Sequence, residues 1–362
     1  MKKFAVQMSA ICIPVLFLIM SVNYFIDPAN IFQNGKYEKG IADLLCDSLN
    51  ITNIVNYDER LQQKFFIECT HQPDLLILGS SRSMLISSDF FENKNIKNNS
   101  VSGASIEDYL AIYHLYQRRK MKPKVVLFCL DPWILNDNNG QYRWMSLTDD
   151  YFLMYENIEG NTFGDKKDKF LIKLKNSVNK YYELVSLSYF QESLSNLELK
   201  GRTIYYPTKN KVNDTFTKLI DGSICYDKKY RETSDLEVEK EAKKYINSNP
   251  IYSLGNFTNL SKRNQVTLEI FLKYLINKHI KIVIFLAPYH PVVYDFFSNS
   301  NQYKIVLETE SYFEKIATKY DIQIIGSFNP HKYNLINSDF YDGMHCKKSV
   351  IERIFHESLL NF

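Results

Sequence analysis

Short apolar runs rich in β-branched residues recur at five places along the chain. They span Asp74–Gly79, Asn98–Ser102, Lys124–Leu130, Lys281–Ala287 and Ile322–Gly326. Runs of this length with almost no polar interruption are typical of strands buried on both faces of a parallel sheet. We therefore expect five buried parallel strands.

Segments with helical periodicity lie between these runs. They span Ile106–Arg119, Arg263–His279, Ile305–Tyr320 and Ser349–Leu360. The alternation of strands and helices predicts an α/β fold, because right-handed crossovers place helices on both faces of the sheet and so build a three-layer sandwich. The predicted domain covers residues 74–362.

One interval, between the third strand and the helix before the fourth, is far longer than a βα connection requires. Within it, Lys166–Leu199 has the pattern of one or two amphipathic helices, whereas Gly201–Tyr206 and Gly222–Tyr226 resemble short strands or turns near the substrate side. The charged run Glu237–Lys244 is typical of the solvated face of a helix. We therefore expect a mainly helical insertion, a cap or substrate-binding element, at about residues 137–262.

An almost wholly apolar segment covers Phe4–Ile26. About 20 apolar residues cross a bilayer core, Lys2 and Lys3 precede the segment, and Tyr24 and Phe25 stand where an interfacial aromatic belt would lie. These features predict an uncleaved, single-pass transmembrane anchor over residues 1–27, with its basic end in the cytoplasm and everything after it outside. A cleaved signal peptide and a buried core helix are the alternatives.

Residues 28–73 form a predicted connector of mixed polarity, with one helix at about Asp58–Cys69. Cys46 and Cys69 lie in this connector and could pair if the compartment is oxidising. The six cysteines show no C-x-x-C and no ligand-like spacing with histidine, so we expect no zinc or other metal, and no cofactor is indicated. The net charge is only +3 and the lysines are dispersed, which excludes a nucleic-acid footprint.

The first predicted strand ends in Gly79-Ser80-Ser81-Arg82, and we expect a helix to begin directly after it. A tight strand-to-helix turn can present a serine hydroxyl above the sheet, while the helix N-terminus offers N–H groups to a developing oxyanion. Ser81 fits the place of such a nucleophile best. The alternative is a serine that only caps the helix.

A histidine and a carboxylate that could serve this serine stand near the C-terminus, in Asp342-Gly343-Met344-His345. This segment follows the fifth strand, and the carboxyl ends of parallel strands gather at one edge of a sheet, so His345 can reach Ser81. A histidine can accept the serine proton while a carboxylate holds its tautomer and stabilises its protonated form. A turn aspartate beside an incidental loop histidine is the alternative.

Two further residues on the same edge are candidates for contact with a substrate. His290 follows the fourth strand, and Arg82 could bind an anionic group beside the nucleophile. The alternatives are a structural turn around His290 and an ion pair of Arg82 with a carboxylate such as Asp89.

Three short blocks make the chain resemble the SGNH/GDSL hydrolase superfamily. They are Gly-x-Ser at Gly79–Ser81, a glycine after the second strand at Gly103, and D-x-x-H at Asp342–His345. The resemblance implies a five-stranded, flavodoxin-like sheet and a catalytic triad of Ser81, Asp342 and His345. It also implies an oxyanion hole formed by the backbone N–H groups of Ser81 and Gly103.

The third block of this family departs from its usual Gly-x-Asn-Asp pattern. Here the strand end reads Cys129-Leu130-Asp131-Pro132-Trp133, so the expected asparagine donor is absent. An ionised Asp131 would repel an oxyanion, and we expect it instead to bind substrate or the insertion; Asn136 is a speculative replacement donor.

Within the superfamily, the chain looks like the membrane-anchored, extracytoplasmic branch that includes the D-alanyl-lipoteichoic acid protein DltD and the alginate O-acetylation proteins. This likeness implies transfer of an acyl group, chiefly acetyl, to or from a cell-envelope polysaccharide at the bacterial cell membrane, with a membrane-bound O-acyltransferase as donor. An esterase would share the same acyl-enzyme. The alternative from another class is a catalytically degenerate SGNH domain that binds or assembles parts of a polysaccharide machine.

Overall fold

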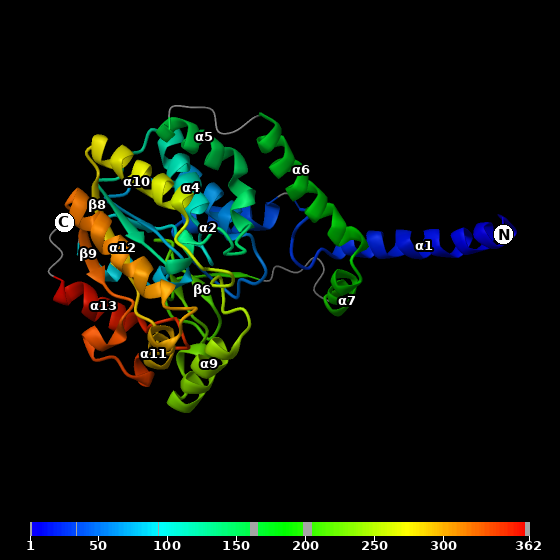
Figure 1. The fold of residues 1–362 in the computed structure, drawn as a ribbon. Helices are drawn as coiled ribbons and strands as arrows, with labels where there is room; N and C mark the ends of the chain where they lie inside the picture. The colour runs from blue at the N-terminus through cyan, green and yellow to red at the C-terminus, as the bar shows by residue number, and fades with distance from the viewer. Residues whose placement is uncertain (1, 34, 93, 160–165, 198–204, 359–362) are drawn as a thin grey trace.

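The computed structural model describes residues 2–33, 35–92, 94–159, 166–197 and 205–358 (Figure 1). Its centre is a five-stranded, wholly parallel sheet in the order β3-β2-β4-β8-β9. The strands are β2 (Leu75–Leu78), β3 (Ile96–Asn98), β4 (Val125–Cys129), β8 (Lys281–Leu286) and β9 (Gln323–Gly326). The predicted α/β class with five parallel strands is confirmed, although β9 at the edge is only partly buried.

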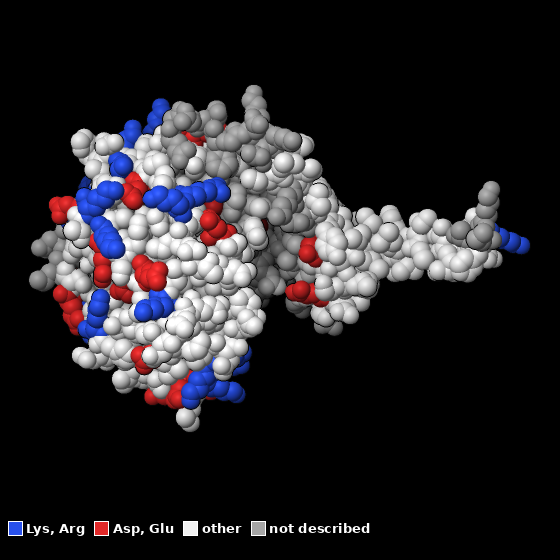
Figure 2. Space-filling model, viewed as in Figure 1, with Lys and Arg blue, Asp and Glu red and all other residues white. Residues whose placement is uncertain are grey.

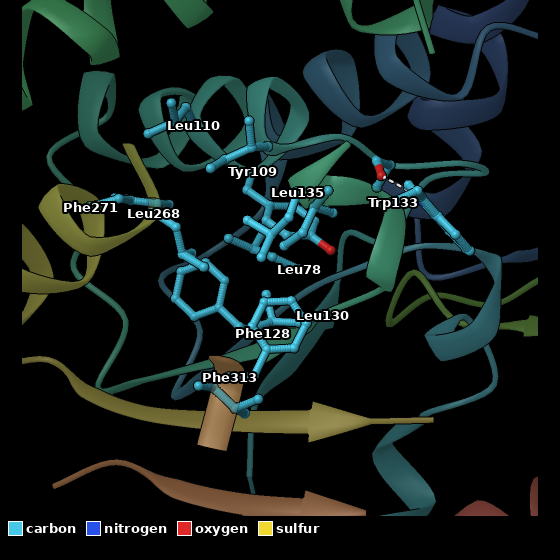
Figure 3. Packing of buried hydrophobic residues seen from close by; sticks show 14 of the residues in the cluster. Leu78, Tyr109, Leu110, Phe128, Leu130, Trp133, Leu135, Leu268, Phe271 and Phe313 are labelled. Carbon is cyan, nitrogen blue, oxygen red and sulfur yellow. Dashed lines mark hydrogen bonds between the residues drawn. The ribbon is translucent and has the colours of Figure 1, made fainter. Parts of the chain in front are cut away.

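Side chains alternate between the two faces of this sheet, as strand geometry requires. Leu78 and Phe128 belong to the larger core cluster, whereas Ile77 and Leu127 belong to a second cluster on the other face. Figure 3 shows the larger cluster, in which Phe128 meets Phe271 with ring centroids 5.4 Å apart. Helices therefore cover both faces.

The helices that flank the sheet match the predicted ones closely. They are α4 (Ile106–Arg118), α10 (Lys262–Asn277) and α12 (Ile305–Tyr320) against the larger cluster, and α13 (Lys348–Glu357) against the other. The helix α11 (Pro291–Asn299) follows β8. The predicted end of the last helix, Leu360, lies outside the described residues.

Two predictions around the first two strands are wrong. The second strand ends at Asn98, and no α-helix follows β2; a single 3₁₀ turn, η1 (Ser81–Ser83), stands there instead. Where the second strand ends, the side-chain Oδ1 of Asn98 accepts the N–H of Ser100 at 3.0 Å. The side-chain amide of Asn98 donates to the carbonyls of Ser83 and Ile86, after β2, at 2.8 Å each. An α-helix would need these carbonyls for its own ladder.

A smaller antiparallel sheet joins the connector to the predicted insertion. Its order is β5-β1-β6-β7, formed by β5 (Tyr206–Thr208), β1 (Asn50–Thr52), β6 (Thr217–Lys218) and β7 (Ile224–Cys225). The short strand expected within Gly222–Tyr226 is present as β7, whereas residues 201–204 lie outside the described residues.

The connector also contains two helices, α2 (Lys36–Cys46) and α3 (Glu59–Cys69). Asp58 caps the second one, since its carboxylate accepts the N–H groups of Arg60 and Leu61 at 2.9 and 3.1 Å. A disulfide joins Cys46 to Cys69, the last residues of the two helices. The pairing left open by the sequence is therefore confirmed in this structure.

Helices dominate the interval between β4 and α10. They are α5 (Thr148–Glu159), α6 (Lys166–Tyr182), α7 (Leu187–Ser195), α8 (Lys228–Arg231) and α9 (Asp235–Asn247), with the 3₁₀ turns η3 (Pro132–Leu135), η4 (Arg143–Leu147) and η5 (Glu183–Val185). The run predicted as a solvated helix face lies in α9, where Glu239 and Lys243 pair on the surface. The insertion boundaries at about 137–262 stay a prediction.

The N-terminal helix α1 (Lys2–Ile26) leaves the rest of the molecule as a projecting rod (Figure 1). Figure 2 shows uncharged side chains along it, up to basic residues at its free end. The span Val6–Ile26 is long and apolar enough to cross a membrane, as a membrane anchor or a signal sequence would be. The alternative of a buried core helix is excluded, because almost none of this span is buried.

Candidate active site

Ser81 and His345 meet at the carboxyl edge of the parallel sheet. Ser81 opens the 3₁₀ turn after β2, and its Oγ lies 2.9 Å from Nε2 of His345. His345 stands in the loop before α13, where a bridge between Phe340 and Cys346 closes the loop that carries it. Both residues are part-buried, so the serine hydroxyl has a base within hydrogen-bond distance and remains open to a reactant.

Asp342 completes a line of three groups, because its Oδ2 lies 2.8 Å from Nδ1 of His345. Its other oxygen, Oδ1, accepts the backbone N–H groups of Met344 and His345 at 2.7 and 2.8 Å. Burial raises the pKa of Asp342, but the His345 imidazole and these hydrogen bonds outweigh it and lower the pKa well below its ordinary range. The carboxylate is therefore ionised, fixed to its loop and aimed at the imidazole.

Tyr230 of α8 makes a fourth contact with this group. Its hydroxyl donates to Oδ2 of Asp342 at 2.5 Å and lies 3.5 Å from Nδ1 of His345. Burial and the neighbouring Asp342 raise the pKa of Tyr230, so the phenol stays protonated and donates. The sequence analysis missed this residue, since nothing in the spacing of Tyr230 relates it to a loop more than a hundred positions later.

Gly103 occupies a turn that only glycine fits. Its φ is +57°, and the N–H of Ala104 donates to the carbonyl of Val101 at 3.1 Å, so Gly103 holds the third position of a β-turn that requires positive φ. The N–H of Val101 in turn donates to Gly79 at 3.0 Å, which fixes this turn beside the loop of Ser81. Within the described parts of the chain, neither the Ser81 nor the Gly103 backbone N–H has an acceptor.

Residues of the connector helix α3 form hydrogen bonds with the same turn. Glu59 accepts the backbone N–H and the hydroxyl of Ser102, the latter at 2.7 Å, and Arg60 donates to the Ser102 carbonyl at 2.9 Å. Arg60 is itself buried in a two-bonded pair with Asp108, at 2.9 Å for each bond. The sequence predicted this helix, but it carried no signal that the helix supports the site.

Polar side chains from the segment after β4 lie against Gly103. A Cβ on Gly103 would fall 2.6 Å from Nη2 of Arg143 and 2.7 Å from Oε1 of Gln141. Arg143 Nη2 donates to Gln141 and to the hydroxyl of Tyr252, both at 3.0 Å, while the rest of the side chain is exposed. The guanidinium of Arg143, a residue that the sequence did not predict for the site, therefore lies against Gly103.

Arg82 does not occupy the place predicted for it. Only 3 % of it is exposed, and its nitrogens donate to the carbonyls of Met344, Ala287 and Pro288 and to Asp131 Oδ1 at 2.9 Å. A substrate anion has no access to it, so its prediction as a substrate-binding residue is not supported. Its suggested pairing with Asp89 is wrong, because Asp89 pairs with Lys211 and Lys348.

Asp131 is likewise buried, and it pairs with Arg82 beneath the site instead of facing a substrate. Burial raises the pKa of Asp131, and the guanidinium opposes that rise. Asn136, the speculative donor, is also buried, and its amide donates to the carbonyls of Ser253 and Gly255 at 3.0 and 3.3 Å. Neither residue supplies the missing donor of the third block.

His290 is fully buried and caps the N-terminus of α11. Its Nδ1 accepts the N–H of Val292 at 3.2 Å, and burial lowers its pKa. This placement matches the structural-turn alternative rather than contact with a substrate.

In comparisons with known proteins, no family model matches the chain and no curated protein matches it. The case for a function therefore rests on the geometry of the site.

Proposed function

We propose that the chain is a membrane-anchored serine acyltransferase or esterase that works outside the cytoplasm through an acyl-enzyme on Ser81. One observation carries this proposal: Ser81, His345 and Asp342 form a continuous hydrogen-bonded line, at 2.9 and 2.8 Å, near the backbone N–H groups of Ser81 and Gly103, to which the described residues offer no acceptor. Acyl transfer needs a nucleophile, a base, a group that orients the base and a nearby site for the developing anion.

The proposed reaction begins when His345 Nε2 takes the Ser81 hydroxyl proton as Oγ attacks the acyl carbonyl. The N–H groups of Ser81 and Gly103 stabilise the tetrahedral oxyanion, while Asp342 stabilises the imidazolium. Collapse breaks the bond to the leaving alcohol, which takes the proton from Nε2. A second hydroxyl then repeats the steps in reverse and releases Ser81; in an esterase that hydroxyl is water.

The fold supports the SGNH resemblance. Numbered in chain order within the sheet, β3-β2-β4-β8-β9 corresponds to the flavodoxin-like order 2-1-3-4-5, and helices cover both faces as in a three-layer sandwich. The blocks of Ser81, Gly103 and His345 all lie in loops at the carboxyl edge. An acetyl group, a cell-envelope polysaccharide acceptor and a membrane-bound O-acyltransferase donor follow from the resemblance alone.

The contacts at the base of α1 support an anchor that is retained. Asn23 is fully buried, and its amide donates to the carbonyls of Glu183, Leu184 and Ser186 at 3.0 to 3.1 Å. Cleavage near this residue would remove these bonds. The Cys46–Cys69 disulfide adds support for an extracytoplasmic domain, because disulfides persist in oxidising compartments.

The second candidate function is a non-catalytic binding or assembly component of a polysaccharide machine. The observation that favours it is the buried Arg82–Asp131 pair, which stands where the family's third block carries an asparagine donor. Under this second candidate function, the Ser81 site no longer catalyses a reaction, and the Arg82–Asp131 ion pair holds its loops in place.

Covalent labelling of the full-length chain by a fluorophosphonate separates the two candidates. We expect labelling of the wild type, none of Ser81→Ala, and unchanged labelling of Ser80→Ala, because the Ser80 hydroxyl contacts the Arg82 N–H and the Asp131 carboxyl instead of His345. A folded wild type that stays unlabelled would favour the binding component. Release of acetate in water, against transfer to an added oligosaccharide, then distinguishes esterase from transferase.

A further inference from the structure

The helix α6 (Lys166–Tyr182) has an apolar face that is largely exposed. It consists of Phe170, Leu171, Leu174, Val178, Tyr181 and Tyr182, which are 46 to 66 % exposed. At 3.6 residues per turn these six positions fall within an arc of about 120°. From residue 170 to the end of α6 the charged positions Lys173, Lys175 and Lys180 fall outside that arc, whereas Lys167 in the first turn falls within it. We name these six residues the α6 stripe.

Two lysines of α6 have partners on other elements of the described chain. Lys173 pairs with Asp149 of α5, and Lys180 lies over the ring of Phe32 with its Nζ 5.9 Å from the centroid. Ile172 packs against the large core cluster. The helix is therefore seated on the protein by one side and presents the stripe on the other.

The stripe is continuous with the base of α1. The 3₁₀ turn η5 follows α6 directly, and its carbonyls at Glu183 and Leu184 accept two hydrogen bonds from Asn23 in the last turns of α1. Val185 and Leu187, 40 and 64 % exposed, follow the stripe along the chain, and Tyr24 and Phe25 in the last turn of α1 are 52 and 64 % exposed. Figure 1 shows α6 and α7 gathered at the point where α1 leaves the domain.

We propose that the α6 stripe lies in the lipid interface of the membrane that α1 spans, so that α6 acts as a second, in-plane membrane contact. A single spanning helix fixes depth, but it can tilt in the bilayer and rotate about its own axis, and a domain packed on it turns with it. An amphipathic helix with its apolar face in the headgroup boundary adds a second point of attachment and fixes the tilt. The helix is about 26 Å long, which is enough to set the orientation of the domain above the bilayer.

This inference rests on the proposed membrane anchorage by α1. A bilayer suits the stripe because the stripe is uncharged, extends along one helix, ends in the tyrosines Tyr181 and Tyr182 near the base of α1, and adjoins the span. A membrane-protein partner would cover the stripe instead of lipid, and the test below separates the two.

The experiment is tryptophan quenching in the full-length chain, reconstituted into phosphatidylcholine nanodiscs whose acyl chains are brominated near the headgroup. The native tryptophans Trp133 and Trp144 are buried and give a constant background. Leu174→Trp reports from the stripe, and Lys173→Trp, the next residue on another side of the helix, is the matched control. Phe25→Trp in α1 is the reference for membrane anchorage.

We expect brominated lipid to quench Leu174→Trp to the same degree as Phe25→Trp and to leave Lys173→Trp unchanged. Val178→Trp gives a second reading from the same stripe. If Phe25→Trp is quenched while both stripe variants are not, α1 anchors the protein but the stripe faces water or a protein, and the inference is overturned. If Phe25→Trp is also unquenched, the anchorage itself fails, and the inference fails with it.

Discussion

The two oxygens of Asp342 have separate partners. Oδ1 accepts two backbone N–H groups of its own loop, while Oδ2 faces His345 Nδ1 and the Tyr230 hydroxyl. The backbone bonds fix where the carboxylate stands, and the Tyr230 bond limits its rotation. Each of these contacts favours the ionised carboxylate, which is the form that can orient and stabilise an imidazolium.

Tyr230 is therefore a positioning residue whose removal should affect rate more than folding. We expect Tyr230→Phe to slow labelling of Ser81 by about 10- to 100-fold, which is the worth of a hydrogen bond to a charged group. Tyr226→Phe is the matched control, because Tyr226 faces the His345 ring but no described hydrogen bond joins its hydroxyl to Asp342. Equal rates in the two variants would remove Tyr230 from the site.

Asp342 also makes stability depend on pH. Its pKa in the folded chain is lower than the ordinary value of 3.8, so the ionised carboxylate stabilises the fold fully above that value and loses this contribution as pH falls through the lower folded pKa. We expect the free energy of unfolding of the wild type to fall more steeply below pH 4 than that of Asp342→Asn, by about 1.4 kcal/mol for each unit of pKa lowering. Urea unfolding at a series of pH values measures this difference, and parallel curves would contradict it.

At the scale of elements, the connector is part of the support for the site. Its helix α3 contributes Glu59 and Arg60 to the turn of Gly103, and its strand β1 pairs with β5 and β6. The disulfide ties the end of α3 to the end of α2. The connector, which was predicted only to link the membrane to the domain, therefore also positions the turn of Gly103.

The disulfide gives a prediction at this scale. Replacing both Cys46 and Cys69 by serine should lower the free energy of unfolding by about 3 kcal/mol, the value expected for a loop of this length. Cys225→Ser, at a free cysteine, should leave it nearly unchanged. Denaturant unfolding of the three proteins is the measurement, and equal midpoints would show that the bridge contributes nothing.

The elements that could be predicted are those whose signal is local. The strands β2, β4, β8 and β9 are apolar runs. The D-x-x-H pattern places Asp342 and His345 three residues apart in one loop. In the segment after β2, the carbonyls of Ser83 and Ile86 are bound by the side-chain amide of Asn98, a contact that no sequence pattern predicts.

The residues that were misread share one physical cause. Arg82 and Asp131 have polar side chains next to a predicted nucleophile, and polar residues there suggest contact with a substrate. The sequence could not show that they face inward and pair at 2.9 Å. Conversely, Tyr230 and Arg143 come from the long segment between β4 and α10, and only the folded chain brings them to the site.

At the scale of the whole molecule, the rod of α1 and the domain are one packed structure. Asn23 binds three carbonyls around η5, and Ser193 of α7 donates to its Oδ1 at 3.3 Å. Asp27 accepts the N–H groups of Ile31 and Phe32 and the hydroxyl of Tyr189, at 2.7 to 2.8 Å. The direction in which α1 enters a membrane therefore sets the direction in which the Ser81 edge faces.

Removing the Asn23 contacts should loosen the packing between α1 and the domain without unfolding the domain. We expect Asn23→Leu to remove the hydrogen bonds to these three carbonyls, cost about 2 kcal/mol locally and raise hydrogen exchange in α7 and η5 of the full-length chain. Ser21→Leu is the control, because the Ser21 hydroxyl donates only to Phe17 within its own helix at 2.7 Å. If both variants exchange like the wild type, the Asn23 contacts do not couple the rod to the domain, and the direction of α1 no longer fixes that of the site.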